Sequence, residues 1–316
     1  MTGPAPMVAL VEQYLAHRRT LGFALRIEGG QLVSFARFAD AIGHRGPLTL
    51  DLIVRWATRP SRRPRRFPAR RLDVVRPFAR YRAGLDLATE VPPRGLLGPA
   101  RRRPDHHIFT AVELAALVAE ARCLAPATGL RPTTFATLFG LLAATGLRVA
   151  EALRLTRDDV DLATGILTIR ATKFRKSRLV PLHATTTVAL RAYADDRDLA
   201  VPRPASPRFF TTATGTELPY PTVRGVFRRL CATLGWEARV PRPRIHDMRH
   251  AFACRRLQQW YVEGVEVAPR VAALATYLGH AKITDTYWYL TGTPELLALA
   301  ATRFAAFAAD TTGGPR

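Results

Sequence analysis

The sequence predicts a mainly α-helical protein with a small antiparallel β-sheet, divided into two domains. Three observations favour this fold class. Apolar residues recur at helical spacing along most of the 316 residues, one pair of short alternating segments has the pattern of a β-hairpin, and a stretch dense in Pro, Gly and Arg separates two helical regions. We therefore expect a helical domain over residues 1–90, a linker over 91–107, and a second domain over 108–316 that ends in a helix.

The N-terminal region, 8–84, predicts four helices. Apolar side chains repeat every three or four positions in its first three segments, and glycines between these segments mark the turns. A fourth helix is expected over 70–82, with an apolar stripe formed by Leu72, Val75 and Phe78. Pro77 falls inside this stripe and should kink or shorten the helix, because proline has no amide N–H to donate.

The linker, 91–107, is expected to be an extended tether. It is dense in proline and glycine and includes the basic tract 101–104, a composition that disfavours a packed core. Such a tether would allow two domains to bind opposite faces of a duplex.

The second domain is predicted to be mostly helical around one β-hairpin. Thr110 and Glu113 have the spacing of a capping box at the start of its first helix. Strands with alternating apolar residues are expected over 166–170 and 178–182, joined by a short turn. Further helices are expected over 133–144, from Arg148 onward, and over 183–197, 222–234, 246–260, 270–278, 283–290 and 295–308.

The chain is strongly basic, with 47 Lys and Arg residues against 25 Asp and Glu residues and a formal net charge of +22. A charge of this size points to a polyanion, and nucleic acid is the usual one. An arginine excess can also reflect a GC-rich coding sequence, but the charge acts electrostatically whatever its origin. The densest basic run, Arg59 to Arg71, is either a solvated loop or a surface for DNA phosphates, and we favour the second interpretation.

Several patterns argue against membrane, secreted and metal-binding classes. The sequence has no long apolar run, and its start lacks a basic patch that leads into an apolar segment, so we expect neither a membrane span nor a signal peptide. The three cysteines are far apart and form no Cys-x-x-Cys pair, which disfavours disulfides and zinc. Neither a Walker motif nor a carboxylate cluster with metal-ligand spacing is found. We expect a protein that works in a reducing cytoplasm, and these patterns are consistent with a reaction that uses no cofactor and no metal.

Residues that can carry chemistry gather between Ile245 and Leu290. His246 and Arg249 are spaced to share one face of a helix, and a second histidine, His280, follows a Leu-Gly break. A phenol near guanidinium and imidazole groups suggests attack on a phosphodiester, with the phenol as nucleophile and the other groups holding the phosphate. Chemistry alone leaves the nucleophile open among three tyrosines, Tyr277, Tyr287 and Tyr289.

Five motifs together resemble the tyrosine recombinase, or phage integrase, family in order and spacing over residues 109–290. They are Thr-Gly-Leu-Arg148-Val-Ala-Glu151, the hairpin Lys173, His246-Asp-Met-Arg249-His250, Leu-Gly-His280 and Tyr289. A lone Leu-Gly-His is common, whereas the ordered set is specific. The resemblance implies a C-terminal catalytic domain of this family and, from general character only, an N-terminal core-binding domain that contacts DNA.

The resemblance implies catalytic roles that suit phosphodiester cleavage. Arg148 and Arg249 would clamp the non-bridging oxygens, because planar guanidinium groups match that geometry. His246 would donate to the same phosphate or exchange a proton with the tyrosine, and His280 would hydrogen-bond a non-bridging oxygen. Glu151 would orient Arg148 or its surroundings rather than react.

The general acid and the nucleophile are selected by the family's spacing. Only three lysines occur in the chain, and two of them, Lys173 and Lys176, lie in the hairpin turn. A lysine there makes chemical sense, because an ammonium can give up a proton to the departing 5′-oxygen and a guanidinium cannot. The family's lysine lies at the first turn position, which selects Lys173 over Lys176. The family's tyrosine follows the histidine at the spacing that selects Tyr289 over Tyr287.

The resemblance implies a site-specific DNA recombinase or integrase of a mobile element that cuts and rejoins double-stranded DNA through a 3′-phosphotyrosyl intermediate. Four protomers would assemble on two DNA sites and exchange strands through a Holliday junction, with 294–308 packed on its own domain or docked on a neighbour. Accessory DNA-bending proteins would be compatible with this reaction, which would take place in the bacterial cytoplasm, on the nucleoid. The alternatives are a type IB topoisomerase, which rejoins the same strand, and a non-catalytic DNA-binding protein of the same fold.

Overall fold

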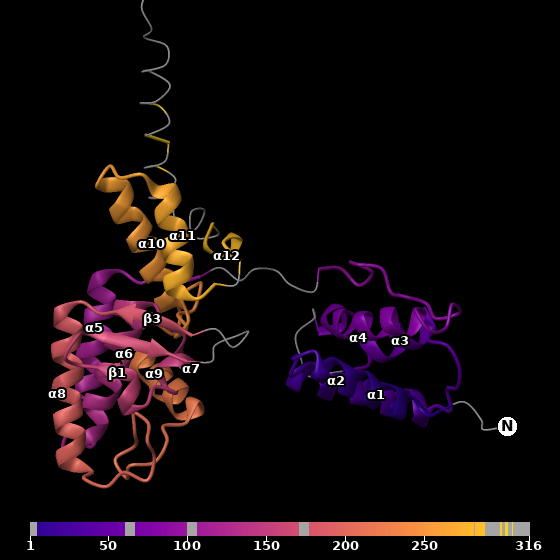
Figure 1. Cartoon of the computed structure of the whole chain (residues 1–316), viewed down its shortest axis with the longest axis horizontal. Helices are drawn as coiled ribbons and strands as arrows, with labels where there is room; N and C mark the ends of the chain where they lie inside the picture. Colours follow the sequence, from indigo (N-terminus) through magenta and orange to yellow (C-terminus); the bar gives the residue numbers. More distant parts are fainter. Residues whose placement is uncertain are drawn as a thin grey trace, which may run out of the picture. The chain divides into compact units, whose positions relative to one another are not determined.

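The computed structural model describes residues 5–60, 67–99, 106–170, 177–280 and 282–287, together with isolated positions between 298 and 305. Its contacts divide the chain into two compact units, an N-terminal unit over Met1–Pro104 and a C-terminal unit over Asp105–Arg316. In Figure 1 the N-terminal unit carries α1 to α4, and the C-terminal unit carries α5 to α12 and the β-sheet.

The N-terminal unit is built from four helices around an apolar core. These helices are α1 (Met7–Thr20), α2 (Arg26–Ala41), α3 (Leu50–Thr58) and α4 (Phe67–Ala83). Their buried faces carry residues from the predicted apolar stripes, among them Val11, Leu32, Phe35, Ile53 and Phe78. Phe35 packs edge-on against Trp56, with ring centroids 5.4 Å apart. The four predicted helical segments are confirmed.

Pro77 does not shorten the fourth helix. α4 runs through this proline from Phe67 to Ala83 and is longer than the predicted 70–82. A proline inside a helix costs about 3 kcal/mol, because one amide hydrogen bond is lost. Val75 and Phe78 are fully buried beside it, and burial of such side chains contributes about 1.5–3 kcal/mol each. Packing therefore outweighs the local penalty, and the prediction of a shortened helix is wrong.

The first described part of the predicted linker, 91–99, is packed rather than extended, and its other described residues, 106–107, belong to the C-terminal unit. Arg76 of α4 is buried, and its guanidinium donates from Nε to the carbonyl of Pro92 (2.8 Å) and from Nη2 to the carbonyl of Pro93 (3.1 Å). Val91 and Leu97 pack against the core of the N-terminal unit. Prolines have no N–H to donate, but their carbonyls are strong acceptors, and a buried arginine uses them here.

The C-terminal unit is mostly helical. Thr110 Oγ1 accepts a hydrogen bond from the Glu113 amide (3.1 Å), and Glu113 Oε2 accepts one from the Thr110 amide (2.8 Å), so the predicted capping box is confirmed. The helices are α5 (Ala111–Arg122), α6 (Leu130–Thr145), α7 (Val149–Ala152), α8 (Ala184–Ala200), α9 (Tyr220–Thr233), α10 (Asp247–Val262), α11 (Val267–Leu278) and α12 (Thr284–Tyr287). The helix predicted over 295–308 lies outside the described residues, apart from isolated positions.

A small antiparallel sheet accompanies these helices. Its strands, in the order β1-β2-β3, are β1 (Val160–Asp161), β2 (Ile166–Ile169) and β3 (Arg178–Pro181). Ile166 pairs with Pro181 and Ile169 with Arg178, so the predicted hairpin is confirmed, while the short β1 was not predicted. The hairpin turn 171–176, with Lys173 and Lys176, lies outside the described residues.

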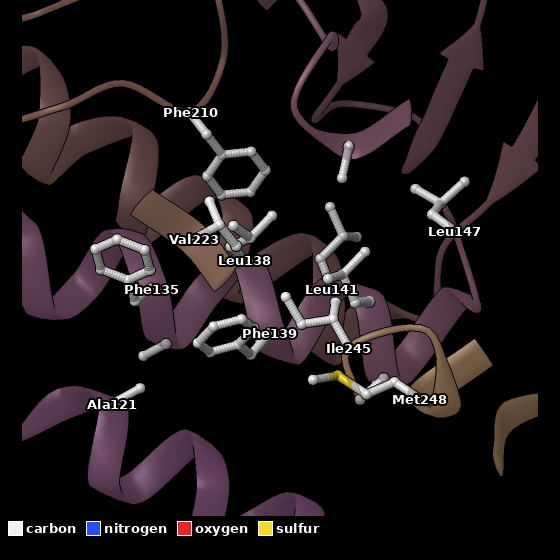
Figure 2. Close-up of a cluster of buried hydrophobic side chains, with 14 of the residues drawn as sticks. Ala121, Phe135, Leu138, Phe139, Leu141, Leu147, Phe210, Val223, Ile245 and Met248 are labelled. Atoms are coloured by element: carbon white, nitrogen blue, oxygen red, sulfur yellow. The ribbon is translucent and has the colours of Figure 1, made fainter. Parts of the chain in front are cut away.

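The core of the C-terminal unit surrounds α6. Figure 2 shows side chains of this helix, such as Phe139 and Leu141, packed among Val223 of α9, Met248 of α10 and Ile245, which precedes α10. A smaller cluster that includes Phe252 and Leu278 joins α10 to α11. In Figure 1, α10, α11 and α12 gather at one end of this unit, next to β3. This packing fixes the start of α10 against the end of α6, where the candidate site lies.

The predicted fold class, mainly α with a small antiparallel sheet, is confirmed. Among the described residues, no helix combines the length and the apolar character needed to cross a bilayer.

Candidate active site

The turn that ends α6 places Arg148 at the candidate site. Gly146 terminates this helix in the left-handed region, at φ +62°, and Arg148 becomes the residue before the first turn of α7. A Cβ atom at Gly146 would lie 2.7 Å from Cδ1 of Phe252, so both the conformation and the packing require glycine here. The Arg148 side chain keeps about a third of its surface (34%) open to solvent. The turn therefore leaves a guanidinium accessible at the rim of the core.

Arg249 reaches the same place from the first turn of α10. It is almost fully buried, and its guanidinium donates from Nη1 to the carbonyl of Gly146 (2.9 Å) and from Nη2 to the carbonyl of Leu278 (2.7 Å). Arg148 Nη2 donates to the next carbonyl, that of Gly279, at 3.2 Å. The two arginines thus meet at the C-terminal end of α11, where unpaired carbonyls and the helix dipole favour cations.

Glu151 is a buried carboxylate shared by two arginines. Its Oε1 accepts from Arg148 Nη1 (2.8 Å), and its two oxygens accept from Arg178 Nη1 (3.2 Å) and Nη2 (2.8 Å). Burial alone would raise the pKa of Glu151, but the hydrogen bonds and charges of Arg178 and Arg148 outweigh it and hold this pKa below 4.5. Glu151 therefore stays ionised. Sequence reasoning placed Arg178 in a strand and missed its part in the site.

His246 precedes the first turn of α10, close to both arginines. Its ring lies edge-on to that of His250, with centroids 5.1 Å apart. Desolvation by the surrounding groups, together with the Arg249 and Arg148 charges, lowers the pKa of His246 to about 4. Part of the His246 residue is nevertheless exposed to solvent, so its ring is open to a substrate. A neutral imidazole near pH 7 can either accept a proton or donate an N–H.

Behind His246 lies a network centred on the buried carboxylate of Asp247. Asp247 Oδ1 is 3.0 Å from His106 Nδ1 and accepts from Arg244 Nη2 (3.1 Å), while its Oδ2 accepts from the Arg244 amide (2.9 Å). The His106 and His250 rings are in contact, with centroids 3.6 Å apart and their planes tilted by 33°. The potential ligand atoms of His106, Asp247 and His250 lie within 4.8 Å of one another. Because the Arg244 guanidinium already binds the Asp247 carboxylate, and its Nη2 lies 3.1 Å from His106 Nδ1, this trio is poorly suited to a metal cation.

The buried His250 should make folding stability depend on pH. Burial and the neighbouring His106, His246, Arg249 and Arg244 lower its pKa from 6.5 to about 3. Below pH 6.5 this histidine is protonated in the unfolded chain, whereas in the folded chain it stays neutral down to about pH 3. Acid therefore favours unfolding. Between pH 7.5 and pH 5.5 we expect the unfolding free energy of the wild type to fall by roughly 1.4 kcal/mol more than that of His250→Asn, measured by urea unfolding. Equal losses in the two proteins would mean that His250 titrates normally.

His280 follows Gly279, which ends α11 at φ +69°. Its Nδ1 lies 2.6 Å from Oγ1 of Thr286, a fully buried residue of α12. If the hydroxyl donates to Nδ1, the proton of the neutral ring lies on Nε2, where it can be donated to a phosphate oxygen. This contact ties the histidine to the helix that leads into Tyr289, and sequence reasoning did not single out Thr286.

The structure thus brings together four of the six predicted site residues: Arg148, His246, Arg249 and His280. Lys173 and Tyr289 lie outside the described residues. Tyr277, one of the alternative nucleophiles, stacks on Phe252 with ring centroids 5.7 Å apart, and burial raises the pKa of its phenol to about 12. A phenol that is this hard to deprotonate and is packed in an apolar cluster is a poor nucleophile.

Comparison with known proteins relates this fold and site to a family. The phage integrase family profile matches residues 109–295. An integrase/recombinase of Sinorhizobium fredii, y4rB, is 42% identical over 295 residues, which cover 91% of this chain and 93% of that protein. The tyrosine recombinase XerD of Caulobacter vibrioides is 30% identical over 234 residues, or 73% of this chain and 72% of that protein.

Solved structures share the architecture. The Tn1549 transposon integrase, in complex with transposon right-end DNA, gives a TM-score of 0.68 at 16% identity and covers 95% of this chain and 100% of that one. The XerH site-specific recombinase bound to a palindromic difH substrate gives a TM-score of 0.67 at 18% identity, and the match covers 95% of this chain and 86% of that one. At such low identities the similarity to solved structures establishes the fold alone, and family membership rests on the sequence matches. The chain belongs to the phage integrase family and is a tyrosine site-specific recombinase.

Proposed function

We propose that the protein cuts and rejoins double-stranded DNA at specific sites through a 3′-phosphotyrosyl intermediate. The observation that carries this proposal is the convergence of Arg148 and Arg249 on the end of α11, directly before His280, with His246 close to both arginines. Two guanidinium groups and two imidazoles at one spot suit a phosphodiester whose non-bridging oxygens gain negative charge in the transition state. Because the two guanidinium groups are already held by backbone carbonyls and, for Arg148, by Glu151, they need little reorganisation when DNA binds.

The catalytic steps assign one role to each predicted residue. The phenol oxygen of Tyr289 attacks the phosphorus atom and passes its proton to His246. The bond from phosphorus to the 5′-oxygen breaks, and Lys173 protonates the departing oxygen. Arg148 and Arg249 stabilise the charge on the non-bridging oxygens, and His280 donates a hydrogen bond there. Attack by a 5′-hydroxyl of a partner strand reverses these transfers, so the bond energy is kept in the tyrosyl ester and no nucleotide is hydrolysed.

The partner we infer is duplex DNA of a mobile element. The net charge of +22 favours a polyanionic partner. The similar XerH and Tn1549 proteins were solved in complex with a difH substrate and with transposon DNA. We propose that the N-terminal unit is the core-binding domain that grips one face of the duplex. In the basic run, Arg71 donates to the carbonyls of Trp56, Ala57 and Arg59 and so caps α3. Phosphate contacts are therefore better assigned to the other arginines of this run.

A nicked DNA substrate tests the chemistry. It would carry sequence from the ends of the element that encodes the protein, with a nick just beyond the scissile phosphate so that the short 5′-hydroxyl fragment diffuses away. We expect a denaturant-resistant adduct that contains the strand upstream of the break. An adduct with the downstream strand would contradict the proposed polarity, and bound DNA without any adduct would favour a non-catalytic protein.

Two further substrates test recombination and self-association. A pair of sites should yield strand-exchanged products, which requires that protomers assemble across both sites. Relaxation of a supercoiled plasmid without such sites, and no exchange between sites, would instead favour a topoisomerase.

A further inference from the structure

Arg178 has a largely shielded side chain and no role in the proposed catalytic steps. It lies on β3, and only 9% of its side chain is exposed. Its guanidinium faces the Glu151 carboxylate with both Nη atoms, and its Nε donates to the carbonyl of Tyr277 at 2.7 Å. Two parallel hydrogen bonds to one carboxylate are the strongest geometry available to this pair.

Three arginines from three elements bind three successive carbonyls at the end of α11. Arg178 donates to the carbonyl of Tyr277, Arg249 to that of Leu278, and Arg148 to that of Gly279. Arg148 and Arg249 are the two proposed phosphate ligands. The Arg178 guanidinium instead turns its two Nη atoms to Glu151 and is shielded from solvent, so it cannot serve as a third ligand.

The charges in this cluster show what Arg178 does for Arg148. Glu151 carries one negative charge and is 2% exposed, so it needs a cationic partner. With Arg178 present, this carboxylate is bound on both oxygens, and the two guanidinium groups and one carboxylate leave a net positive charge at Arg148. Without Arg178, Arg148 would be the only arginine among the described residues that pairs with Glu151, and it would lose much of its attraction for a phosphate.

Arg178 also fixes the base of the hairpin that carries Lys173. It pairs with Ile169 at the last rung of the β2–β3 ladder before the turn. A Cβ atom at Gly279 would lie 2.7 Å from Arg178 Nη1, so the Arg178 guanidinium packs directly against the backbone at the end of α11. One side chain therefore links the hairpin base, Glu151 and the residue before His280.

We propose that Arg178 is a positioning residue for strand cleavage: it satisfies Glu151, keeps the Arg148 charge available for the scissile phosphate, and anchors the hairpin of Lys173. This inference rests on the proposed roles of Arg148 and Lys173. The wild-type adduct on nicked DNA tests the proposed cleavage chemistry separately, so a failure of that chemistry and a failure of the Arg178 proposal give different results.

The first test compares Arg178→Met with a control, Arg157→Met. Arg157 forms another two-pronged pair, with Asp198 of α8, and takes no part in the network around Glu151. At saturating nicked DNA we expect Arg178→Met to form the adduct about 100-fold more slowly, with unchanged DNA affinity. The control should match the wild type. Equal rates for the two variants, or a loss confined to DNA affinity, would overturn the proposal.

A second comparison separates positioning from a general loss of folding. If Arg178 acts through Glu151, a neutral side chain at position 151 no longer needs the arginine. Arg178→Met should therefore lower the adduct rate only a few-fold in a Glu151→Gln background. Arg178→Lys retains the charge but not the two-pronged geometry, and its rate should lie between those of the wild type and Arg178→Met. Full additivity of the Arg178→Met and Glu151→Gln losses would refute an action through Glu151.

Discussion

Tyr289→Phe is expected to abolish the covalent protein–DNA adduct completely. Phenylalanine keeps the ring and removes the only atom that can attack phosphorus, so the loss should be total rather than partial. The measurement is adduct formation on nicked DNA, resolved under denaturing conditions.

Tyr287→Phe is the matched control, because this tyrosine lies in the same segment, at the end of α12. It should form the adduct at a rate near that of the wild type, and both variants should bind DNA as the wild type does. Loss of the adduct in Tyr287→Phe, with Tyr289→Phe active, would place the nucleophile two residues earlier and contradict the family spacing.

Arg249→Lys should lower the rate of adduct formation by about a thousandfold. A planar guanidinium holds the carbonyls of Gly146 and Leu278 at once, and an ammonium on a flexible stem cannot reproduce both contacts and also meet a phosphate. The charge is kept in this variant, so a large loss would show that geometry matters beyond charge. The rate should be measured at saturating DNA.

Arg255→Lys is a suitable control for this substitution. Arg255 lies on the same helix and donates from Nη2 to the carbonyl of Ala143, also near the end of α6, at 3.1 Å. Its replacement should disturb folding to a similar extent and leave the adduct rate within a few-fold of the wild type. Equal losses in both variants would mean that Arg249 supports the fold rather than the reaction.

Local elements could be predicted from the sequence because their signals lie within a few residues. The capping box of Thr110 and Glu113 and the hairpin of 166–169 with 178–181 are examples. Prediction failed where packing overrode a local rule. α4 continues through Pro77, and the prolines after Val91 lie against Arg76 instead of extending the chain. In both places the contacts of buried side chains outweigh the local backbone preference of proline.

The sequence by itself determined the family, the order and spacing of the predicted site residues and the basic character of this recombinase, because residue type and spacing are properties of the chain alone. Only the tertiary structure decided how those residues work together. The Arg148 and Arg249 guanidinium groups bind carbonyls 131 and 29 positions away, and Arg178 joins Glu151 across 27 positions. Contacts across such distances depend on how α6, α10, α11 and β3 pack around one core, and no local sequence signal specifies them.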